Sequence, residues 1–528
     1  MNHAISLILR LAWAEGLTIF LAAQVIATAA PDPAGTNDLA KINHIIVIFQ
    51  ENWSFDSLYP SFPGADGLSN AGAAIPQIDK SGQPITLVPQ PLNAGVPDNR
   101  FPTNLPVGPY DLTKYVAADQ TTGDLAVGFY REQLQIDNGV LEPSRGSMDR
   151  YIAWSDNGGL VFSYIDSTSL PEGLLAQQYV MCDKWFHSAY GGSFLNHHFL
   201  IAAAAPTWAN APANLLANTN LASFKDGAAT ADGYIVNTLY TVNTPHPTNV
   251  VPSQLLPSQT NVTVGDRLSE KGISWKWYSG GWSNAVTGNP DRLFQYHHQP
   301  FAYYANYADG TAAKAEHLQD ELVFLADLTN GTLPAVSFIK PLGQDNEHPG
   351  YANEIQGQQH VASLVSAVQA SPYWQDAAII VTYDEHGGRW DHVAPPMIDR
   401  WGLGTRVPAI IVSPFAKPHY VDHTQYETVS ILKFIERRFG LAPLSARDAN
   451  PSVNDLSNAF DFSLIEFAPP SLGQDSNGPT LTLRWTGTGR LESAAALGGA
   501  WQDTGATNGV YTGSISADSN RFYRLVWP

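Results

Sequence analysis

Cysteine and basic residues are scarce in this chain of 528 residues. Cys182 is its single cysteine, so no disulfide can form within the chain. Lysine and arginine together number 28 against 48 acidic residues, which gives a formal net charge of −20. Because nucleic acids and anionic membranes are bound by surfaces rich in lysine and arginine, this balance argues against both as partners.

Charged residues of either sign are also few, at 14% of the chain, whereas hydrophobic residues make up 44%. Such a chain is globular, and its length is enough for one large domain plus smaller additions. Glycine (43), proline (37), tyrosine (22) and tryptophan (14) are plentiful. This composition predicts long ordered loops that pack through aromatic side chains.

Long hydrophobic runs are lacking outside the first thirty residues. There, Arg10 precedes a short apolar stretch over residues 16–26, and residues 27–29 (ATA) form a small-residue cleavage signal. Glu15 and Gln24 make this stretch a poor transmembrane helix. We therefore predict a signal peptide over residues 1–29 and an exported protein, periplasmic or secreted, with no integral membrane segment after cleavage. The alternative is a buried N-terminal helix.

Apolar strand-like and helix-like segments alternate over most of the chain. The expected strands cover residues 45–49, 273–278, 335–339, 378–383 and 407–412. The expected helices cover residues 128–136, 148–154, 174–179, 316–328, 358–369 and 428–439. This alternation predicts an α/β catalytic domain over residues 40–468, built on a mostly parallel sheet flanked by helices.

The last part of the chain has a different character. Residues 471–479 form a polar, glycine-containing segment that we interpret as a linker. Four short strand-like pieces follow, at residues 481–485, 490–494, 511–515 and 522–527. We therefore predict a small all-β module over residues 479–528. It carries no cluster of ionisable residues, which favours a structural or attachment role.

Two of the expected strands end in groups that bind hard cations. The strand 45–49 and the strand 378–383 are each followed closely by a pair of oxygen-bearing side chains. These side chains are Glu51, Asn52, Asp384 and Glu385. Because ligands bind at the carboxyl ends of parallel strands and clustered carboxylates repel one another, the pattern indicates a cation site. Turn formation or helix capping is the alternative for each pair alone.

A possible nucleophile stands in a glycine turn further along the chain. Ser193 follows Gly191 and Gly192, where flexible backbone can approach a ligand closely. Leu195 replaces the last glycine of a G-x-S-x-G motif, which disfavours a serine-hydrolase elbow. Metal activation of Ser193 and an ordinary turn both remain open. Asn196 is a candidate donor to a phosphoryl oxygen, with a turn residue as the alternative.

Histidines gather in two regions, at His297, His298 and His348, and again at His386 and His392. Imidazole can donate to a phosphoryl oxygen, protonate a leaving alkoxide or bind a metal. Neither H-E-x-x-H nor a G-x-x-x-x-G-K-[ST] phosphate loop is present, so these two standard motifs assign no role.

Six motifs in order resemble a bacterial phosphoesterase family that joins phospholipases C to broad-specificity acid phosphatases. The motifs are residues 42–56 (INHIIVIFQENWSFD), 130–139 (YREQLQIDNG), 186–197 (FHSAYGGSFLNH), 294–301 (FQYHHQPF), 333–351 (LPAVSFIKPLGQDNEHPGY) and 382–396 (TYDEHGGRWDHVAPP). The resemblance spans roughly residues 40 to 440 and leaves out the C-terminal tail.

The resemblance implies an alkaline-phosphatase-like α/β core and phosphoryl transfer that depends on one or more divalent metal ions. The implied metal ligands are Glu51, Asn52, Asp384, Glu385 and Ser193, and Ser193 is also the implied nucleophile. The groups implied around the phosphate and the leaving group are Asn196, His297, His298 and His348. The two acidic-ended strands would then be neighbours.

Three features bear on the substrate. The segment at Ser193 resembles that of the acid phosphatases, whereas phospholipases C of the family carry threonine in G-P-T-x-P-N-R. The string around His386 is common in the phospholipases, and the histidine that acid phosphatases place near Val127 is absent here. We predict an acid phosphatase that acts through a phosphoserine, with phospholipase C as the alternative. The expected partner is a phosphate-ester small molecule or a phospholipid headgroup.

Two further classes of protein have less support from the sequence. A sulfatase requires a C/S-x-P-x-R motif, which the residues after Cys182 do not supply. A non-catalytic surface-binding protein is supported by the β module alone. The sequence gives no oligomeric state and does not identify the metal.

Overall fold

The computed structural model describes residues 36–463, apart from 73, 140 and 142–147, and six pieces of the tail. These pieces are residues 473–477, 480–484, 490–494, 501–506, 510–514 and 522–526. The predicted signal peptide lies outside the described residues. Within them, no helix combines the length and the apolar character needed to cross a bilayer.

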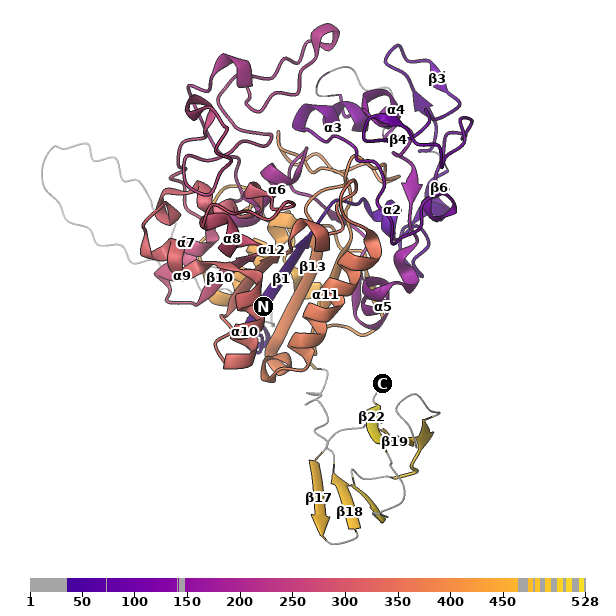
Figure 1. Ribbon diagram of the computed structural model, residues 1–528, viewed down its shortest axis with the longest axis vertical. Coiled ribbons are helices and arrows are strands. Elements are labelled where there is room, and N and C mark those ends of the chain that lie inside the picture. The colour runs from indigo at the N-terminus through magenta and orange to yellow at the C-terminus, as the bar shows by residue number, and fades with distance from the viewer. Residues whose placement is uncertain are drawn as a thin grey trace, which may run out of the picture.

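An eight-stranded sheet forms the centre of the protein (Figure 1). In spatial order its strands are β11 (Leu318–Asp320), β10 (Trp275–Ser279), β12 (Val336–Lys340), β1 (His44–Gln50), β13 (Ala377–Tyr383), β14 (Ala409–Val412), β8 (Val180–Cys182) and β15 (Tyr420–Asp422). The central strands β1 and β13 are buried along nearly their whole length. Runs of β-branched residues suit such strands because both faces of the sheet are covered.

Most neighbouring strands run parallel, as predicted. β14 is the exception, since it is antiparallel to both β13 and β8. β1 pairs directly with β13, and the register sets Gln50 opposite Tyr383 at the carboxyl ends. The residues that follow these two strands therefore leave the sheet side by side.

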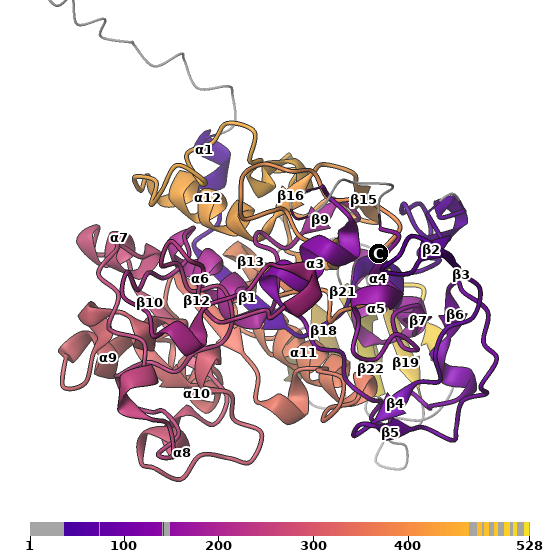
Figure 2. The ribbon, with the colours of Figure 1, turned by 90° about the horizontal axis from the view of Figure 1, so that it is seen from above.

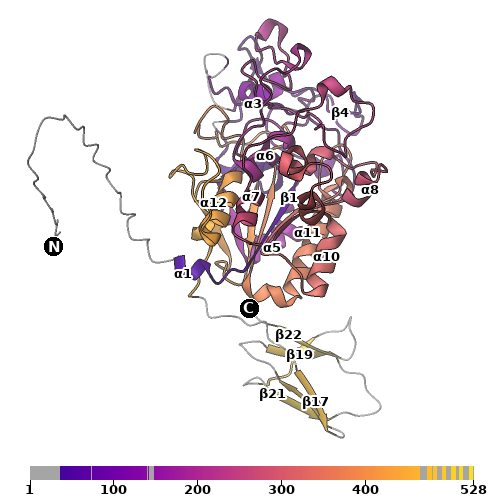
Figure 3. The ribbon, with the colours of Figure 1, turned by 90° about the vertical axis from the view of Figure 1, so that its left-hand side faces the viewer.

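Helices cover both faces of the sheet. The longer ones are α3 (Phe129–Ile136), α5 (Pro171–Gln178), α6 (Ser193–Ala202), α10 (Glu321–Asn330), α11 (Glu354–Gln369) and α12 (Thr428–Phe439). The shorter ones are α1 (Thr36–Leu39), α2 (Phe55–Leu58), α4 (Tyr151–Trp154), α7 (Val264–Glu270), α8 (Trp282–Val286) and α9 (Ala312–His317). Figures 2 and 3 show α10 and α11 on one face and α12 on the other. The helix α12 ends at Gly440 in a left-handed conformation, as the sequence predicts.

Long connections join these elements. Residues 205–262 contain three short 3₁₀ turns but no α-helix or paired strand, in agreement with their content of Asn, Thr and Pro. Short strands occur elsewhere in the connections. They are β2 (Gln77–Ile78), β3 (Pro84–Ile85), β4 (Leu92–Asn93), β5 (Val96–Pro97), β6 (Tyr110–Asp111), β7 (Ser163–Tyr164), β9 (Trp185–Phe186) and β16 (Tyr426–Glu427).

Two segments differ from the sequence-based expectation. The helix predicted over residues 316–328 begins only at Glu321, because residues 318–320 pair with β10 as an edge strand. Asp320 then caps the helix by accepting a hydrogen bond from the backbone N–H of Leu322 at 3.2 Å. The predicted linker 471–479 also contains a strand, β17.

The described part of the tail consists of strands that pair only with one another. They are β17 (Gly473–Asn477), β18 (Thr480–Arg484), β19 (Arg490–Ala494), β20 (Gln502–Asp503), β21 (Val510–Ser514) and β22 (Phe522–Val526). They form two antiparallel three-stranded sheets, β17-β18-β21 and β20-β19-β22. The all-β character predicted for the tail is therefore confirmed.

Three buried glutamates meet between α5, α11 and β13. The Tyr383 hydroxyl lies 2.7 Å from Glu347 Oε2 and 3.1 Å from Glu172 Oε2. Gln358 donates to Glu354 Oε1 at 3.1 Å. Burial, together with the charge of Glu347, raises the pKa of Glu172 and of Glu354 well above the usual range. These two side chains therefore hold protons inside the fold.

Protons held in this way make stability depend on pH. The folded state binds more protons than the unfolded chain, so stability falls as the pH rises above the usual carboxyl range. Glu354→Gln removes the contribution of Glu354 to this dependence, and we expect the variant to melt about 2 °C higher than the wild type at pH 8 and equally at pH 5. Thermal unfolding measures the shift, and the exposed Glu316→Gln is the control. A shift of equal size at both pH values contradicts the assignment.

Candidate active site

Three neighbouring strands bring charged side chains to one edge of the sheet. Glu51 follows β1, Asp384 follows β13, and Lys340 is the last residue of β12. The Lys340 ammonium lies 2.8 Å from Glu51 Oε1 and 3.6 Å from Asp384 Oδ2, and all three side chains are buried. The convergence expected from the resemblance is therefore present, with a lysine between the two carboxylates.

The electrostatic environments of the acidic residues differ. Although burial acts to raise it, His298 and Lys340 hold the pKa of Glu51 well below its usual range. Burial raises the pKa of Asp384 to about 7, with Lys340 opposing the rise. Burial and the charge of Asp384 raise the pKa of Glu385 well above its usual range. The edge of the sheet thus holds more carboxyl groups than its own cations can keep ionised.

Ser193 begins α6 directly above these strand ends, as Figures 1 and 3 show for the helix. Gly191 precedes it with φ of 92°, and a Cβ there would lie 2.7 Å from the Phe129 nitrogen, so the turn requires glycine. The Ser193 side chain lies close to Asp384 and opposes the burial that raises the pKa of that carboxyl, whose two oxygens have no hydrogen-bond partner among the described residues. Ser193 keeps 8% of its surface exposed, whereas Asp384 is fully buried.

Three histidines stand beside Glu51. His298 Nε2 contacts Glu51 Oε1, and the His298 ring stacks on His197 with centroids 5.2 Å apart. His197 lies one turn after Ser193, with Nδ1 3.6 Å from Asp384 Oδ2. His297 meets His298 edge to face at 4.7 Å. The predicted pair 297–298 therefore lies at the site, together with a histidine that the sequence analysis did not select.

His348 lies near the second carboxylate oxygen of Glu51. Its Nε2 lies 3.6 Å from Glu51 Oε2, and its Nδ1 lies 2.6 Å from the Pro349 carbonyl, which orients the ring. Tyr351 stacks on the imidazole with centroids 4.3 Å apart. The side chain of His348 is 16% exposed, so it stands nearer to solvent than the carboxylates do.

Some buried oxygen atoms at this edge have no hydrogen-bond partner among the described residues. They include Asn52 Oδ1 and Glu385 Oε1. A buried carboxylate or amide oxygen without a partner is costly, and a divalent cation supplies the missing interaction. The donor chemistry of the predicted ligand set therefore fits a hard metal ion.

Asn196 is fully buried behind the serine turn. Its Oδ1 accepts a hydrogen bond from the Ala189 N–H at 3.0 Å, and its Nδ2 donates to the Ala189 carbonyl at 3.0 Å. The side chain closes the loop that carries Ser193. Its contact with a phosphoryl oxygen stays a prediction.

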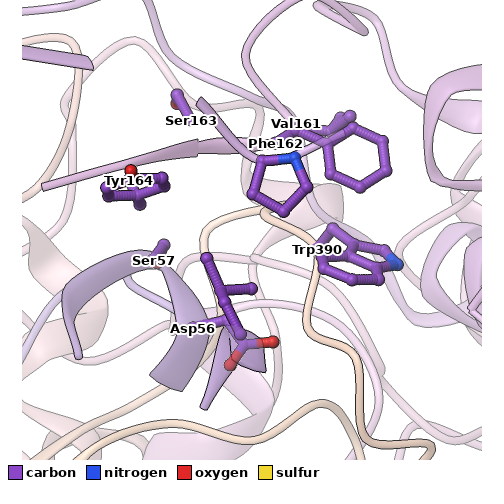
Figure 4. Close-up of a pocket in the computed structure, with 9 residues that line it drawn as sticks. Asp56, Ser57, Val161, Phe162, Ser163, Tyr164 and Trp390 are labelled. Atoms are coloured by element: carbon purple, nitrogen blue, oxygen red, sulfur yellow. The ribbon is translucent and has the colours of Figure 1, made fainter. Parts of the chain in front are cut away.

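Three groups of buried or partly buried side chains in the described residues are compact enough to hold a metal ion. They are Glu51 with His197 and His298, Glu132 with His187 and His386, and Asp56 with Asp391 and His392. The third group is already neutralised, since Arg406 lies 2.8 Å from Asp391 and 3.1 Å from Asp56. Asp56 also borders a small pocket of about 10 Å³, lined mainly by apolar and hydroxyl side chains (Figure 4).

Lys340 and His197 are the site residues that sequence reasoning missed. Lys340 ends a buried apolar strand, so the rule that selected Glu51 and Asp384 applies to it as well. His197 lies four residues after Ser193, on the same face of a helix, but that position shows its relevance only once the helix is known.

The chain belongs to the Phosphoesterase family, whose model matches residues 42–442. The non-hemolytic phospholipase C of Burkholderia pseudomallei is 26% identical, over 85% of this chain and 63% of that protein. Phospholipase C B of Mycobacterium tuberculosis is 24% identical, over 86% of this chain and 84% of that protein. Family and relatives together identify a hydrolase that acts on phosphoric ester bonds.

Solved structures that align with part of this chain have lower sequence identity. An alkaline phosphatase superfamily protein from Vibrio parahaemolyticus is 10% identical, covers 68% of this chain and 76% of that chain, and gives a TM-score of 0.32. A phosphonate monoester hydrolase from Silicibacter pomeroyi is 11% identical, covers 58% and 75%, and gives a TM-score of 0.28.

The buried lysine yields a test of the site electrostatics. Lys340→Met leaves Glu51 and Asp384 without their cation, so we expect a loss of about 3 to 5 kcal/mol in the free energy of unfolding of the metal-free protein. The half-buried Lys276, which pairs with Asp327 at 2.6 Å, is the matched control. Its methionine variant should lose about 1 kcal/mol or less. Denaturant unfolding in the presence of a chelator measures both, and equal losses contradict the expectation.

Proposed function

We propose that the chain is a metal-dependent hydrolase of phosphoric esters in which Ser193 is the nucleophile. The observation that carries the proposal is the group of buried oxygens on Asn52, Asp384 and Glu385 that have no hydrogen-bond partner in the described residues, close to the Ser193 side chain. Ser193 also starts a helix, where backbone N–H groups face an incoming anion.

The ligands of the metal would be Glu51, Asn52, Asp384, Glu385 and the Ser193 hydroxyl. A divalent ion held by them would offset phosphoryl charge and lower the pKa of the attacking hydroxyl. This ligand set supplies oxygen donors, which suits a hard cation. Lys340 remains beside two of the carboxylates and limits their mutual repulsion.

The protein side chains supply the remaining steps. Ser193 attacks phosphorus in line with the ester oxygen, a phosphoserine forms, and water then cleaves it. The leaving alkoxide needs a proton, and His348 is the histidine best placed to give it, because its ring is oriented by Pro349 and reaches solvent. His297 and His298 stand beside Glu51 and would contact the phosphoryl oxygens.

Two substrates are consistent with this site. The Gly-Gly-Ser-Phe-Leu-Asn-His segment resembles the acid phosphatases, which favours a phosphomonoester. The curated relatives named above are phospholipases C, and they match most of this chain, which favours a phospholipid as the second candidate. We infer that the mature protein is exported. With either substrate, Ser193 would attack the phosphorus atom.

Removal of the nucleophile tests the mechanism. Ser193→Ala should lower kcat by about a thousandfold or more while thermal unfolding stays close to that of the wild type. Ser413→Ala, at a buried serine after β14, is the control and should keep full activity. Rapid acid quench followed by mass spectrometry should find phosphate on Ser193 of the wild type. Turnover retained by Ser193→Ala would overturn the assignment.

A comparison of two substrates separates the two candidates. Hydrolysis of para-nitrophenyl phosphate and of phosphatidylcholine should be measured from acidic to neutral pH, with elemental analysis of the same samples. We expect at least a tenfold higher kcat/KM for the monoester, and loss of both activities after chelation. A preference for phosphatidylcholine would identify a phospholipase C. Full activity in a metal-free sample would contradict the metal dependence.

A further inference from the structure

Behind the Ser193 turn lies a carboxylate to which the proposed mechanism gives no task. Glu132 belongs to α3 and to the motif YREQ, and it is fully buried. Its Oε2 accepts a hydrogen bond from the Gly191 N–H at 2.6 Å. Its Oε1 accepts from the Thr405 N–H at 2.8 Å and from the Thr405 hydroxyl at 2.9 Å. One side chain thus fixes the glycine turn that presents Ser193.

The same carboxylate is connected through two histidines to Glu385, one of the proposed metal ligands. His187 Nε2 lies 3.1 Å from Glu132 Oε1 and 3.2 Å from His386 Nδ1. The two imidazole rings are parallel within 4°, with centroids 5.2 Å apart. His386 follows Glu385 in the chain, and its Nδ1 lies 3.5 Å from Glu385 Oε2. Contacts therefore run without a gap from Gly191 to Glu385.

The surrounding residues hold this connection tightly. His187 Nδ1 lies 2.7 Å from the Ala189 carbonyl, which fixes the ring orientation. A Cβ at Gly404 would lie 2.1 Å from the His187 ring, so the backbone packs directly against the imidazole. Tyr151 lies 2.7 Å from the Thr405 hydroxyl and extends the network. A displaced carboxylate would have to move several buried groups together.

We propose that Glu132 is a positioning residue that holds the Ser193 turn and the Glu385 segment at a fixed separation. The inference rests on the proposed function, and it gives Glu132, His187 and His386 a role although they lie outside the predicted site. The proposed nucleophile comes from α6, and the carboxylates come from strand ends far away in the chain. Glu132 connects the two segments, directly at Gly191 and through His187 and His386 at Glu385. A displacement of about 1 Å at a reacting centre costs on the order of a hundredfold in rate.

The same three side chains form one of the groups compact enough for a metal ion, and the hydrogen bonds favour the positioning role. Both oxygens of Glu132 already accept hydrogen bonds from Gly191 and Thr405, so the carboxylate is satisfied by the protein alone. A buried carboxylate with several donors stays ionised, and the pKa of Glu132 is lowered to about 2, because the neighbouring histidines and N–H groups outweigh its burial.

The first experiment replaces the charge and keeps the shape. Glu132→Gln should lower kcat for the better substrate by about a hundredfold, with KM within threefold and an unchanged metal content per folded chain. Gln135→Leu, at a buried position of the same helix, is the control and should keep the wild-type kcat. A kcat within threefold of the wild type overturns the proposal. Loss of a metal equivalent in Glu132→Gln also overturns it, because Glu132 would then be a ligand.

A double-mutant cycle tests whether the network acts as one unit. His187→Gln should reduce kcat as Glu132→Gln does, and the double variant should be no slower than the slower single variant. Independent effects that multiply would contradict a shared positioning role. Should Glu132→Gln fold poorly, Thr405→Val removes one donor and keeps the charge. We expect it to lower kcat several-fold without a change in KM, and an unchanged kcat would overturn the proposal.

The experiments distinguish a failure of the positioning role of Glu132 from a failure of the proposed function. Phosphate found on Ser193 of the wild type supports the nucleophile whatever Glu132 does. Labelled Ser193 together with an unaffected Glu132→Gln would remove only the positioning role. An unlabelled Ser193 in an active wild-type enzyme would remove the proposed function itself.

Discussion

The parallel pairing of β1 with β13 is the constraint on which the site depends. Their register ends with Gln50 opposite Tyr383, so the next residues, Glu51 and Asp384, emerge together from a sheet edge that is closed to water. Like charges in such a place repel strongly, since little solvent screens them. The fold meets this repulsion with Lys340 from the adjoining strand β12, and the remaining negative charge makes the edge attractive to a cation.

Hydrogen bonding divides the side chains around this edge into two classes. Glu132 and Asn196 have their oxygens satisfied by backbone groups, so they fix the shape of the serine turn. Asn52 and Glu385 keep an oxygen without a partner among the described residues, so they remain free for a ligand. The first class holds the serine turn in place, and the second class is available to bind a ligand. The distinction depends on long-range contacts that cannot be read from a sequence motif.

A strand or helix of this protein can be predicted from the sequence when its own residues carry the pattern. The strands 45–49 and 378–383 are readable from their unbroken apolar runs, and α12 from its amphipathic pattern and Gly440. The edge strand at 318–320 was missed, because its residues follow a helical pattern and only pairing with β10 makes them a strand. The family resemblance predicted that β1 and β13 are neighbours. The sequence of either strand alone does not determine which strand it pairs with.

The same argument applies to the site. Glu51, Asp384, Ser193 and the pair 297–298 were predicted and lie together, whereas Lys340 was overlooked although it ends a buried strand. Glu132 lies in one of the six motifs, but no local signal assigned it a role, because its partners come from segments far from it in the chain. Long-range hydrogen bonding of this type becomes visible only in three dimensions.

The cluster of Glu172, Glu347 and Glu354 has a consequence for the whole enzyme. Glu347 directly precedes His348, and Tyr383, which touches the cluster, directly precedes Asp384. The protons on Glu172 and Glu354 therefore belong to a cluster that adjoins two residues of the proposed site, His348 and Asp384. The contribution of these two carboxyl groups to stability is present at low pH and is lost as the pH rises, so the packing next to the proposed site depends on pH.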